Sequence, residues 1–452
     1  MKVIAHFFSK PLFNLTLCAY LGLTNYAVAA SPFNGPMLGS IEIREAKIWL
    51  QAHQSQSVRL VYWLATDASH KYWSETKVLH SDQEFSHVWT LQGLRAGSIY
   101  HYQIESNGKL LPTIYHFKTQ TDWIKRSDPP NLKIALGSCV YLNDSQADPP
   151  GSNLGGDEQI FEKIAEQSPD LMIWMGDNVY LRPSDYYSQA AIGDRYRQLR
   201  QLPQLQKLMQ TVAHYAIWDD HDYGDDNSDR SFRYRSQSLK AFQTYWANST
   251  YGLPELPGIF GRFVWSDVEF FLTDNRSFRA PFKQSNPERD FFGEQQFQWL
   301  KDSLSSSTAK FKLIVLGNQT LNTQTPSENM YSYQREFKRF VDWLATSKIP
   351  GIVLLSGDRH HSELLKLERP GTYPLYEWTL SPLTSKAYAP FDSEKILPLR
   401  VEGSLLAERN FGVLEVIGPA TARKLDLKEF DAQGALRWHY EIPFSDLNPT
   451  MP

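Results

Sequence analysis

The chain has 452 residues, more than one hydrophobic core usually organises, so two folded units with small appendages are expected. Apolar residues make up 42%, charged residues 21% and aromatic residues 13%, which excludes an intrinsically disordered protein. A net charge of −4 at pH 7 excludes a general electrostatic attraction to nucleic acid, so no nucleic-acid partner is expected.

The first thirty residues have the composition of a secretory signal peptide. They contain no acidic residue, begin with a weakly basic segment, continue with an apolar run over 11–23 and end on small residues at 27–30. We expect cleavage after Ala29 or Ala30, and a periplasmic or secreted mature protein. The apolar run is shorter than the about 20 residues that a membrane span needs, so no span is expected after cleavage. An uncleaved N-terminal anchor is the alternative.

The mature chain is left with a single cysteine. Removing residues 1–30 takes away two lysines and no acid, so the net charge changes from −4 to −6. It also removes Cys18 and leaves Cys139, in a compartment where cysteines normally form disulfides. A lone thiol there is buried and inert, reactive, or bound to a metal.

Residues 31–122 predict a small β-sandwich. The runs 46–50 and 58–63 alternate side chains in the manner of half-buried strands. The segment 91–104 resembles the L-x-P-G-x-x-Y-x-Y-x-I stretch of fibronectin type III-like sandwiches, with Ala96 in place of the usual proline. Such modules occur in proteins of many functions, so this segment says nothing about chemistry.

After a polar stretch over 121–130, residues 131–452 alternate compact apolar strands with helical segments. This order is typical of an α/β layered core, in which β-sheets are flanked by helices. A polar excursion over 225–265 is expected to cover the site. The predicted strands are Leu132–Leu136, Leu171–Met175, Tyr215–Trp218, Val268–Leu272, Phe311–Leu316, Gly351–Leu355 and Ala435–Ile442, and the predicted helices are Asp157–Glu166, Tyr196–Met209, Gly293–Leu304 and Glu336–Thr346.

Unusual polar clusters directly follow five of these strands. In open α/β sheets, ligands bind beyond the carboxyl ends of the strands, so we expect the five clusters to define one edge of the sheet. The clusters are Gly137-Ser138-Cys139, Gly176-Asp177-Asn178-Val179-Tyr180, Asp219-Asp220-His221-Asp222, Gly317-Asn318-Gln319 and Gly357-Asp358-Arg359-His360-His361.

The side chains of these clusters predict a coordination sphere for two cations. They offer a thiolate, carboxylates, a phenolate and imidazole. A thiolate with a phenolate favours a redox-capable ion such as Fe³⁺, whereas carboxylate and amide oxygens favour Ca²⁺, Mg²⁺ or Mn²⁺. A mixed pair, one ion such as Fe³⁺ and one of Ca²⁺, Mg²⁺ or Mn²⁺, is therefore expected rather than two identical ions.

The order of the clusters, their placement after strands and the Asp-Asp-His triplet together resemble the alkaline phosphatase D (PhoD-like) branch of the calcineurin-like metallophosphoesterases. That branch also carries an N-terminal β-sandwich and an export signal, so the resemblance spans nearly the whole mature chain. It implies a PhoD-like metallophosphoesterase domain over 131–452.

The resemblance also implies roles for single residues. Asp177 is the carboxylate expected to bridge both metals. Cys139, Tyr180 and His360 are expected to hold the iron-like ion.

The remaining metal ligands expected from the resemblance are Asp220 and Asp358, which would hold the calcium-like ion. His221 is expected beside the phosphate, where it assists departure of the leaving group. Asp219 or Asp222 is expected to orient the His221 ring.

Two further assignments concern the residues that follow the predicted strands Val268–Leu272 and Phe311–Leu316. Arg276, with Arg279 nearby, is predicted to bind phosphate oxygens through its planar guanidinium group. Asn318 or Gln319 occupies the place where the wider superfamily has a metal-ligating histidine. Which of the two faces the metal, or whether either does, is left open.

Each residue also has a simpler explanation. Cys139 alone is a small buried apolar side chain, Asp177 caps a turn and Tyr180 packs. The occurrence of Cys139 with the other clusters favours a ligand role for it, whereas for Tyr180 only the family pattern does so. His214 and His361 match no motif position and are expected to be structural.

The predicted function is therefore that of an exported phosphoesterase, which hydrolyses phosphomonoesters, phosphodiesters or both by attack of a metal-bridged hydroxide on a small substrate. The alternatives are a lipid- or nucleotide-directed phosphodiesterase on the same site, or a non-catalytic surface-binding protein. Comparing p-nitrophenyl phosphate with bis-p-nitrophenyl phosphate separates the enzymatic alternatives. The oligomeric state is left open.

Overall fold

The computed structural model describes residues 32–284, 286 and 288–449. The predicted signal peptide, residues 1–30, lies outside the described residues. Within the described ranges, no helix has the length and apolarity needed to cross a bilayer.

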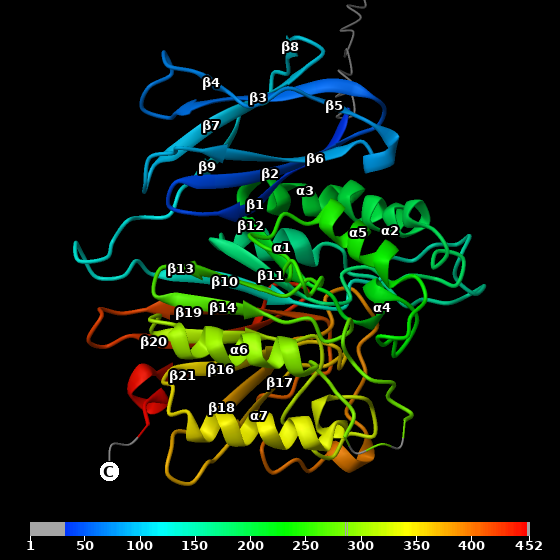
Figure 1. Cartoon of the computed structure of the whole chain (residues 1–452), viewed down its shortest axis with the longest axis vertical. Coiled ribbons are helices and arrows are strands. Elements are labelled where there is room, and N and C mark those ends of the chain that lie inside the picture. Colours follow the sequence, from blue (N-terminus) through cyan, green and yellow to red (C-terminus); the bar gives the residue numbers. More distant parts are fainter. Residues whose placement is uncertain (1–31, 285, 287, 450–452) are drawn as a thin grey trace, which may run out of the picture. The chain divides into compact units, whose positions relative to one another are not determined.

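Two antiparallel sheets form the N-terminal sandwich (Figure 1). On β7, Tyr100, Tyr102 and Ile104 are buried between the sheets while the residues between them are more exposed, which is the alternation that predicted the sandwich. The first sheet holds β1 (Phe33–Ile41), β2 (Glu45–Ala52) and β6 (Ser86–Gln92), and the second holds β3 (Gln56–Leu64), β4 (Tyr72–Trp73), β5 (Lys77–Leu79), β7 (Ile99–Ser106), β8 (Lys109–Leu110) and β9 (Tyr115–Lys118).

The α/β core is built on two six-stranded mixed sheets. The first has the order β12-β11-β10-β19-β20-β21 and consists of β10 (Leu132–Gly137), β11 (Leu171–Met175), β12 (Ala213–Ile217), β19 (Asn410–Ile417), β20 (Lys424–Asp431) and β21 (Leu436–Pro443). The second has the order β13-β14-β15-β16-β18-β17 and consists of β13 (Gly261–Trp265), β14 (Val268–Leu272), β15 (Phe311–Val315), β16 (Ile352–Ser356), β17 (Glu363–Leu367) and β18 (Leu375–Thr379). Strands β10–β12 run parallel in one sheet, and β14, β15, β16 and β18 run parallel in the other.

Alternate residues of the second sheet belong to two different cores. Leu313 of β15 shares a cluster with Leu136 of β10, so the two sheets pack against each other. Its neighbour Ile314 belongs to a second cluster with Leu300 of α6 (Glu294–Ser306) and Phe340 of α7 (Gln334–Thr346). The two helices therefore cover the outer face of this sheet (Figure 1). This layered architecture confirms the predicted fold class.

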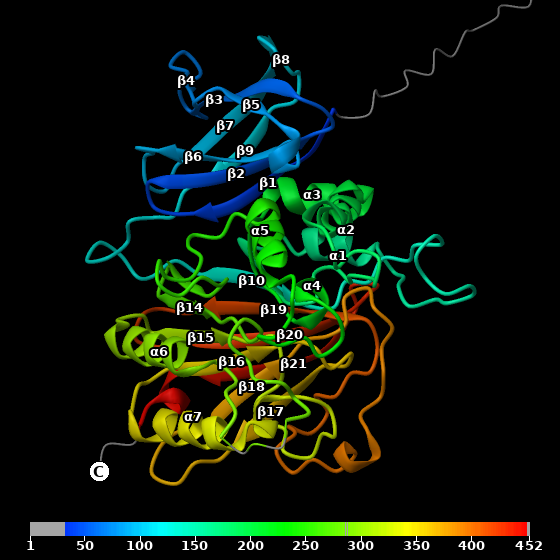
Figure 2. The same ribbon diagram turned by 45° about the vertical axis from the view of Figure 1, so that its right-hand side comes forward.

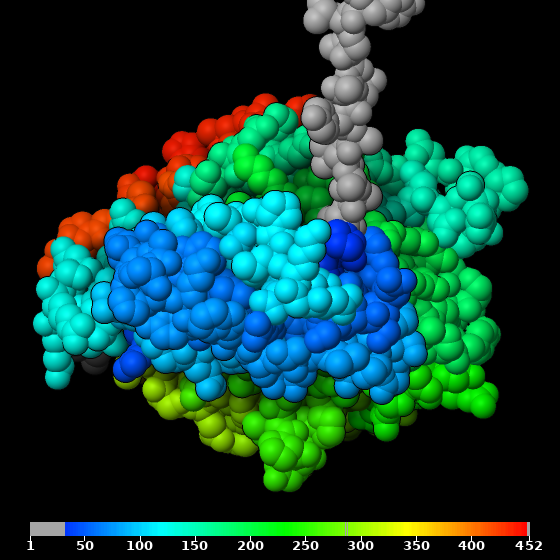
Figure 3. Space-filling model, turned by 90° about the horizontal axis from the view of Figure 1, so that it is seen from above, coloured from blue at the N-terminus to red at the C-terminus, as the bar shows by residue number. Residues whose placement is uncertain are grey.

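Helices α1 (Ile160–Glu166), α2 (Gln189–Gln201), α3 (Pro203–Thr211) and α5 (Arg235–Tyr245) lie beside the first sheet and the sandwich (Figure 2). Two hydrogen bonds tie the sandwich to this part of the chain. The backbone N–H of Ile41 donates to the Tyr215 hydroxyl at 3.1 Å, and Trp49 Nε1 donates to the Thr244 carbonyl at 2.8 Å. Figure 3 shows the surface of the sandwich, with the green segment of these helices next to it. The division into domains at residues 31–122 and 131–452 stays a prediction.

The single helix predicted over Tyr196–Met209 is wrong, because the structure has two helices there, α2 and α3. Leu202 separates them with φ −59° and ψ 122°. The ring of Pro203 disfavours the helical conformation at the residue before it, and Pro203 itself begins α3.

The segment 225–265 does more than cover the site. It contains α5 and β13, and Tyr245 of α5 packs against Trp49 of the sandwich with 5.9 Å between ring centroids. Only Asp226 and Asn227 of this segment line the cavity described below. The expectation that the segment covers the site is therefore wrong for most of it.

The polar clusters meet at one edge of the two sheets. Between clusters of the first sheet, the Cys139 N–H donates to the Gly176 carbonyl at 3.2 Å. Between clusters of the second sheet, the Gly357 N–H donates to the Gly317 carbonyl at 3.0 Å. Asn275, after β14, donates to Asp219, after β12, at 2.7 Å, so the clusters of both sheets are continuous.

We expect Ile352→Ala to lower the free energy of unfolding by about 2–5 kcal/mol, because the truncation leaves a cavity under α6 and α7. Ile352 is fully buried in that core. Ile396→Ala is the matched control, because Ile396 is 86% exposed and its truncation should cost under about 0.5 kcal/mol. Urea unfolding followed by tryptophan fluorescence measures both, and equal losses in the two variants would contradict the assignment of the core.

Candidate functional site

A cavity of about 740 Å³ opens at the edge where the clusters meet. Six of the eight residues predicted for the site line it: Asp177, Tyr180, Asp220, His221, Asp358 and His360. Cys139 is fully buried and adjoins these residues, and Arg276 is fully buried outside the lining. The structure therefore brings together side chains that are more than 200 positions apart in the sequence.

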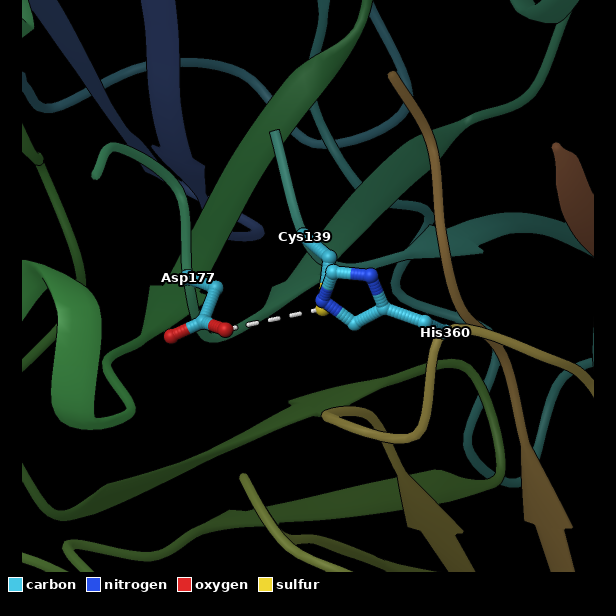
Figure 4. A group of neighbouring side chains, drawn as sticks. All are labelled: Cys139, Asp177 and His360. Atoms are coloured by element: carbon cyan, nitrogen blue, oxygen red, sulfur yellow. Dashed lines mark hydrogen bonds between the residues drawn. The ribbon is translucent and has the colours of Figure 1, made fainter. Parts of the chain in front are cut away.

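Three of these side chains form a first group of potential metal-binding atoms (Figure 4). One ligand atom each from Cys139, Asp177 and His360 lies within 4.8 Å of the other two. The Cys139 thiol is 3.6 Å from Asp177 Oδ2. The three residues follow β10, β11 and β16, so both sheets contribute to the group.

The Tyr180 hydroxyl joins this group. It donates to Asp177 Oδ2 at 3.1 Å and lies 3.0 Å from His360 Nε2. The other ring nitrogen of His360, Nδ1, lies 2.6 Å from the Lys386 carbonyl. Because a carbonyl only accepts, Nδ1 carries the hydrogen and the Nε2 lone pair faces Tyr180 and Asp177. This is the tautomer that a metal-binding histidine needs.

The environment of Cys139 combines burial with hydroxyl donors. Burial raises the pKa of its thiol to about 12. Ser381 donates to the sulfur at 3.1 Å and Ser138 does so at 3.6 Å, and both bonds favour the thiolate. The thiol is therefore neutral without a nearby positive charge, and a cation at this position would ionise it.

A second group of metal-binding atoms shares Asp177 with the first. Ligand atoms of Asp177, Asp220 and His221 lie within 4.8 Å of one another. The His221 N–H donates to Asp177 Oδ1 at 3.2 Å, and the Asn227 N–H donates to Asp220 Oδ2 at 2.7 Å. The His221 ring stacks on Tyr180 with 4.2 Å between centroids. The two groups therefore overlap at the Asp177 carboxylate, which belongs to both.

Asp358 lines the cavity but belongs to neither group. Burial, together with the charges of Asp219 and Asp220, raises its pKa to about 8. Burial and the nearby Asp220 and Cys139 also raise the pKa of Asp177 well above its usual range. Asp177 and Asp358 are therefore close to other acids and have too little positive charge nearby to remain ionised.

The backbone is strained at four of the predicted metal ligands. Cys139, Asp177, Asp358 and His360 have φ angles of 61°, 52°, 72° and 56°, in the left-handed region that side chains other than glycine rarely adopt. Such residues persist where the surrounding structure imposes the conformation, and they cluster at functional sites. Four of the thirteen described non-glycine residues with positive φ lie here, which supports a functional role for this edge.

Arg276 has other partners than the phosphate that the sequence analysis expected. Its Nε donates to Asp219 Oδ1 at 2.6 Å, and a second nitrogen lies 2.5 Å from Glu328. The guanidinium is fully buried and does not line the cavity. Arg279 also pairs with Glu328, at 2.8 Å. In this structure both arginines neutralise Glu328, which lines the cavity, and Arg276 also neutralises the buried Asp219.

Neither amide after β15 presents a free oxygen to the cavity. Asn318 Oδ1 accepts hydrogen bonds from Asn275, Arg276 and Arg279. Gln319 bonds Glu363 and Thr379 through its nitrogen, and its oxygen accepts from Arg359.

Asp219 and Asp222 do not reach the His221 ring through any hydrogen bond in the described structure. Asp219 holds Arg276, and Asp222 Oδ2 accepts from the backbone and side chain of Asn178. The ring is oriented by Tyr180 instead. The expectation that one of the two acids orients it is therefore wrong.

Sequence reasoning missed several residues of the cavity and its support, among them Asn227, Glu328, Ser381 and Lys386. Asn227 and Glu328 line the cavity, and Ser381 and the Lys386 carbonyl hold the metal-binding atoms. Asn227 lies six positions after the Asp-Asp-His triplet, so its nearness to that cluster in the sequence could have revealed it. The other three lie in loops without any local signal.

Comparison with known proteins matches this arrangement to one family. The sequence model of the PhoD-like phosphatases matches residues 138–411, which is more than half of the chain and contains every predicted site residue. The chain belongs to the PhoD-like phosphatase family. Alkaline phosphatase D of Bacillus subtilis (strain 168) is 23% identical in an alignment 321 residues long that covers 60% of this chain and 52% of that protein. The chain thus spans about half the length of this curated relative.

Two solved structures share the fold of this PhoD-like phosphatase. A structure of PhoD matches with a TM-score of 0.74 and 17% identity, and covers 92% of each chain. Purple acid phosphatase PPD1 from yellow lupin seeds matches with a TM-score of 0.65 and 11% identity, over 90% of this chain and 74% of that one. At these identities the likeness shows the metallophosphoesterase fold.

The donor set of this family member fits two cations. Asp177 stands in both groups, which suits a carboxylate that two ions share. The crowding that raises the pKa values of Asp177 and Asp358 would be relieved by positive charge placed between them. Cys139 belongs to the first group only and adds a soft sulfur donor there, so the two positions differ in chemistry.

The two histidines expected to be structural differ in environment. Trp174 Nε1 donates to His214 Nδ1 at 2.8 Å, and His214 Nε2 lies 3.2 Å from the Leu208 carbonyl. Burial lowers the pKa of His214 to about 3. His361 is 1% exposed, lines the cavity, and both its ring nitrogens are without a hydrogen-bond partner among the described residues.

We expect His214 to make the fold sensitive to acid. The unfolded chain takes up a proton at His214 near pH 6.5, whereas the folded protein resists it down to about pH 3, so stability falls as the pH decreases through this window. Protonation of His214 in the unfolded chain should lower the free energy of unfolding by about 2 kcal/mol between pH 6.5 and pH 5.

His214→Asn should therefore be less stable than the original chain at pH 7 but should lose less stability between pH 7 and pH 5. Urea unfolding at both pH values measures the difference. His80→Asn, at an exposed histidine, is the control and should keep the original pH dependence. An unchanged pH dependence in His214→Asn would show that His214 is not the sensitive group.

Proposed function

We propose that this protein is an exported phosphoesterase that hydrolyses phosphomonoesters, phosphodiesters or both at a centre of two cations. The observation that carries the proposal is the position of Asp177, whose carboxylate belongs to two groups of metal-binding atoms at the floor of one cavity. Membership of the PhoD-like phosphatase family supports the same activity. Residues 1–30 would direct export to the periplasm or beyond, and residues 31–122 and 131–452 would form separate domains.

The proposed ligands divide between the two ions according to their chemistry. Cys139, Tyr180 and His360 would hold Fe³⁺, because thiolate and phenolate favour a redox-capable ion. Asp220 and Asp358 would hold Ca²⁺, or Mn²⁺ or Mg²⁺, because carboxylate oxygens suit hard cations. Zn²⁺ is an alternative in either position.

When bound, the two cations lower the pKa of water and neutralise phosphate oxygens. The side chains of the chain then supply the remaining functions. His221 lines the cavity beside Asp177 and would donate a proton to the leaving oxygen of the ester. Tyr180 holds the His221 ring by stacking, which fixes the direction of that proton. Arg276 would act as a positioning residue for Asp219, in place of the substrate-binding role expected from sequence.

The alternatives remain distinguishable. A lipid- or nucleotide-directed phosphodiesterase would use the same cavity and would prefer diesters with a larger organic group. A non-catalytic surface-binding protein would have no need for the strained backbone at four predicted ligands, since that strain costs about 1–3 kcal/mol per residue. The hydrolytic proposal accounts for the strain more simply.

We expect the purified protein to contain two metal ions and to absorb visible light, because thiolate and phenolate bound to ferric iron give coloured complexes. Cys139→Ser and Tyr180→Phe should shift or abolish the band, while Tyr187→Phe, at a tyrosine that is 65% exposed, should retain it. Elemental analysis and absorption spectroscopy measure both. A colourless protein that holds iron in full amount would contradict the assignment of Cys139 and Tyr180.

We expect His221→Gln to slow hydrolysis of glycerol 3-phosphate about 10²–10⁴-fold in kcat, because an alkoxide leaving group needs a proton. Hydrolysis of p-nitrophenyl phosphate should fall much less, since p-nitrophenolate leaves without protonation. Steady-state kinetics on both esters, with the metal content measured in parallel, tests this.

The same experiment separates two possible roles of His221, as a proton donor and as a metal ligand. The second role arises because a ring nitrogen of His221 lies within 4.8 Å of carboxylate oxygens of Asp177 and Asp220. Equal losses on both esters, together with loss of one metal ion, would show that His221 is a ligand and would overturn its role as a proton donor.

A further inference from the structure

One wall of the cavity is a rim segment, residues 386–394, that the proposed mechanism does not use. Lys386, Tyr388 and Phe391 line the cavity from this segment. Tyr388 and Phe391 are each 48% exposed, and Lys386 is exposed as well. Large aromatic side chains therefore face open space next to the metal-binding residues.

The rim segment is fixed to the motif that carries Asp358 and His360. The Tyr388 N–H donates to the His360 carbonyl at 2.8 Å, and the Tyr388 ring stacks on His360 with 5.3 Å between centroids. At the other end, Glu394 accepts from Arg359 at 2.7 and 2.9 Å and from the Phe391 N–H at 2.8 Å. The exposed side chains of the rim are thus held at a defined place beside the site.

Charge distinguishes Lys386 from the rest of the lining. Five carboxyl groups line the cavity: Asp177, Asp220, Asp226, Glu328 and Asp358. Besides histidines, the described lining has two cationic side chains, Arg359 and Lys386. Arg359 is paired with Glu394, whereas Lys386 has no carboxylate within ion-pair distance among the described residues and lies 5.6 Å from the Tyr388 ring centroid. The Lys386 ammonium therefore contacts an aromatic ring but has no anionic partner among the described residues, and it can meet an anionic group of a ligand.

The size of the cavity also exceeds what a phosphate group alone would fill. A volume of about 740 Å³ is in the range of sites for small organic ligands. An aromatic ring stacks on exposed Tyr or Phe side chains, and a lysine ammonium binds phosphate. A ligand that binds both kinds of rim side chain therefore combines a planar ring with an anionic group in addition to the scissile phosphate.

We propose that the rim segment is a leaving-group subsite for nucleoside diphosphates, with Lys386 on the phosphate that stays with the nucleoside and Tyr388 and Phe391 against the base. The proposal rests on the proposed phosphoesterase function and names its substrate class. In the reaction, the oxygen of water bonds to the terminal phosphorus and the bond from that phosphorus to the bridging oxygen breaks. The bridging oxygen keeps the electron pair and leaves on the nucleoside monophosphate, and the proton released from water goes to solvent.

The test compares ADP with p-nitrophenyl phosphate, which has no second anionic group. For Lys386→Met, we expect the ratio of KM for ADP to KM for p-nitrophenyl phosphate to rise about tenfold, because only ADP offers a second anionic group to Lys386. The nitrophenyl ring can also stack on Tyr388, so Tyr388→Leu is tested by calorimetry with α,β-methylene ADP, which binds without turnover. We expect the Kd of this analogue to rise about tenfold in both variants. Lys395→Met is the matched control, since Lys395 lies in the next turn, pairs with Asp392 and does not line the cavity.

The outcomes separate this inference from the proposed function. If the original chain hydrolyses p-nitrophenyl phosphate but neither variant changes the KM ratio or the Kd of α,β-methylene ADP, the subsite is overturned and the phosphoesterase function stands. If the metal-loaded protein hydrolyses neither p-nitrophenyl phosphate nor bis-p-nitrophenyl phosphate, the phosphoesterase function fails, and an unchanged Kd in Lys386→Met overturns the subsite independently. A tenfold change in Lys395→Met equal to that in Lys386→Met would also overturn it, because the effect would then be one of surface charge.

Discussion

The carboxylate of Asp177 is the constraint around which the site is built. It belongs to two groups of metal-binding atoms, and it is buried among other acids that raise its pKa. A carboxyl in that position is costly to ionise unless positive charge lies beside it. The arrangement is therefore stable as an ionised site only with cations, which is why the donors are better explained as a metal centre than as an acidic cluster in the core.

The backbone at this position has an unusual conformation. The strands β10, β11 and β16 end just before residues whose φ angles lie in the left-handed region. Arg276 and Arg279 balance Asp219 and Glu328, so part of the negative charge of the region is neutralised by the protein itself.

The rim segment differs in character from the rest of the cavity lining. It presents aromatic rings and Lys386, which has no carboxylate within ion-pair distance among the described residues, whereas five carboxyl groups line the remainder. Because the rim is bonded to the motif that carries His360 and Asp358, its exposed side chains are held next to the proposed metal ligands.

The sequence by itself determined the layered fold and most of the floor of the site. Short apolar strands ending in Gly-Ser-Cys, Gly-Asp-Asn and Gly-Asp-Arg-His placed the polar residues at carboxyl ends, because side-chain alternation and strand length are local properties; β11 and β14 have the predicted bounds. Other features depended on contacts between distant segments. Arg276 was expected to bind phosphate, but its partner Glu328 lies 52 positions away in a loop without periodicity. The stacking of Tyr180 on His221 and the bond from His360 to the Lys386 carbonyl were likewise decided only by the tertiary structure, because burial and hydrogen-bond partners are set by which loops meet at the sheet edge.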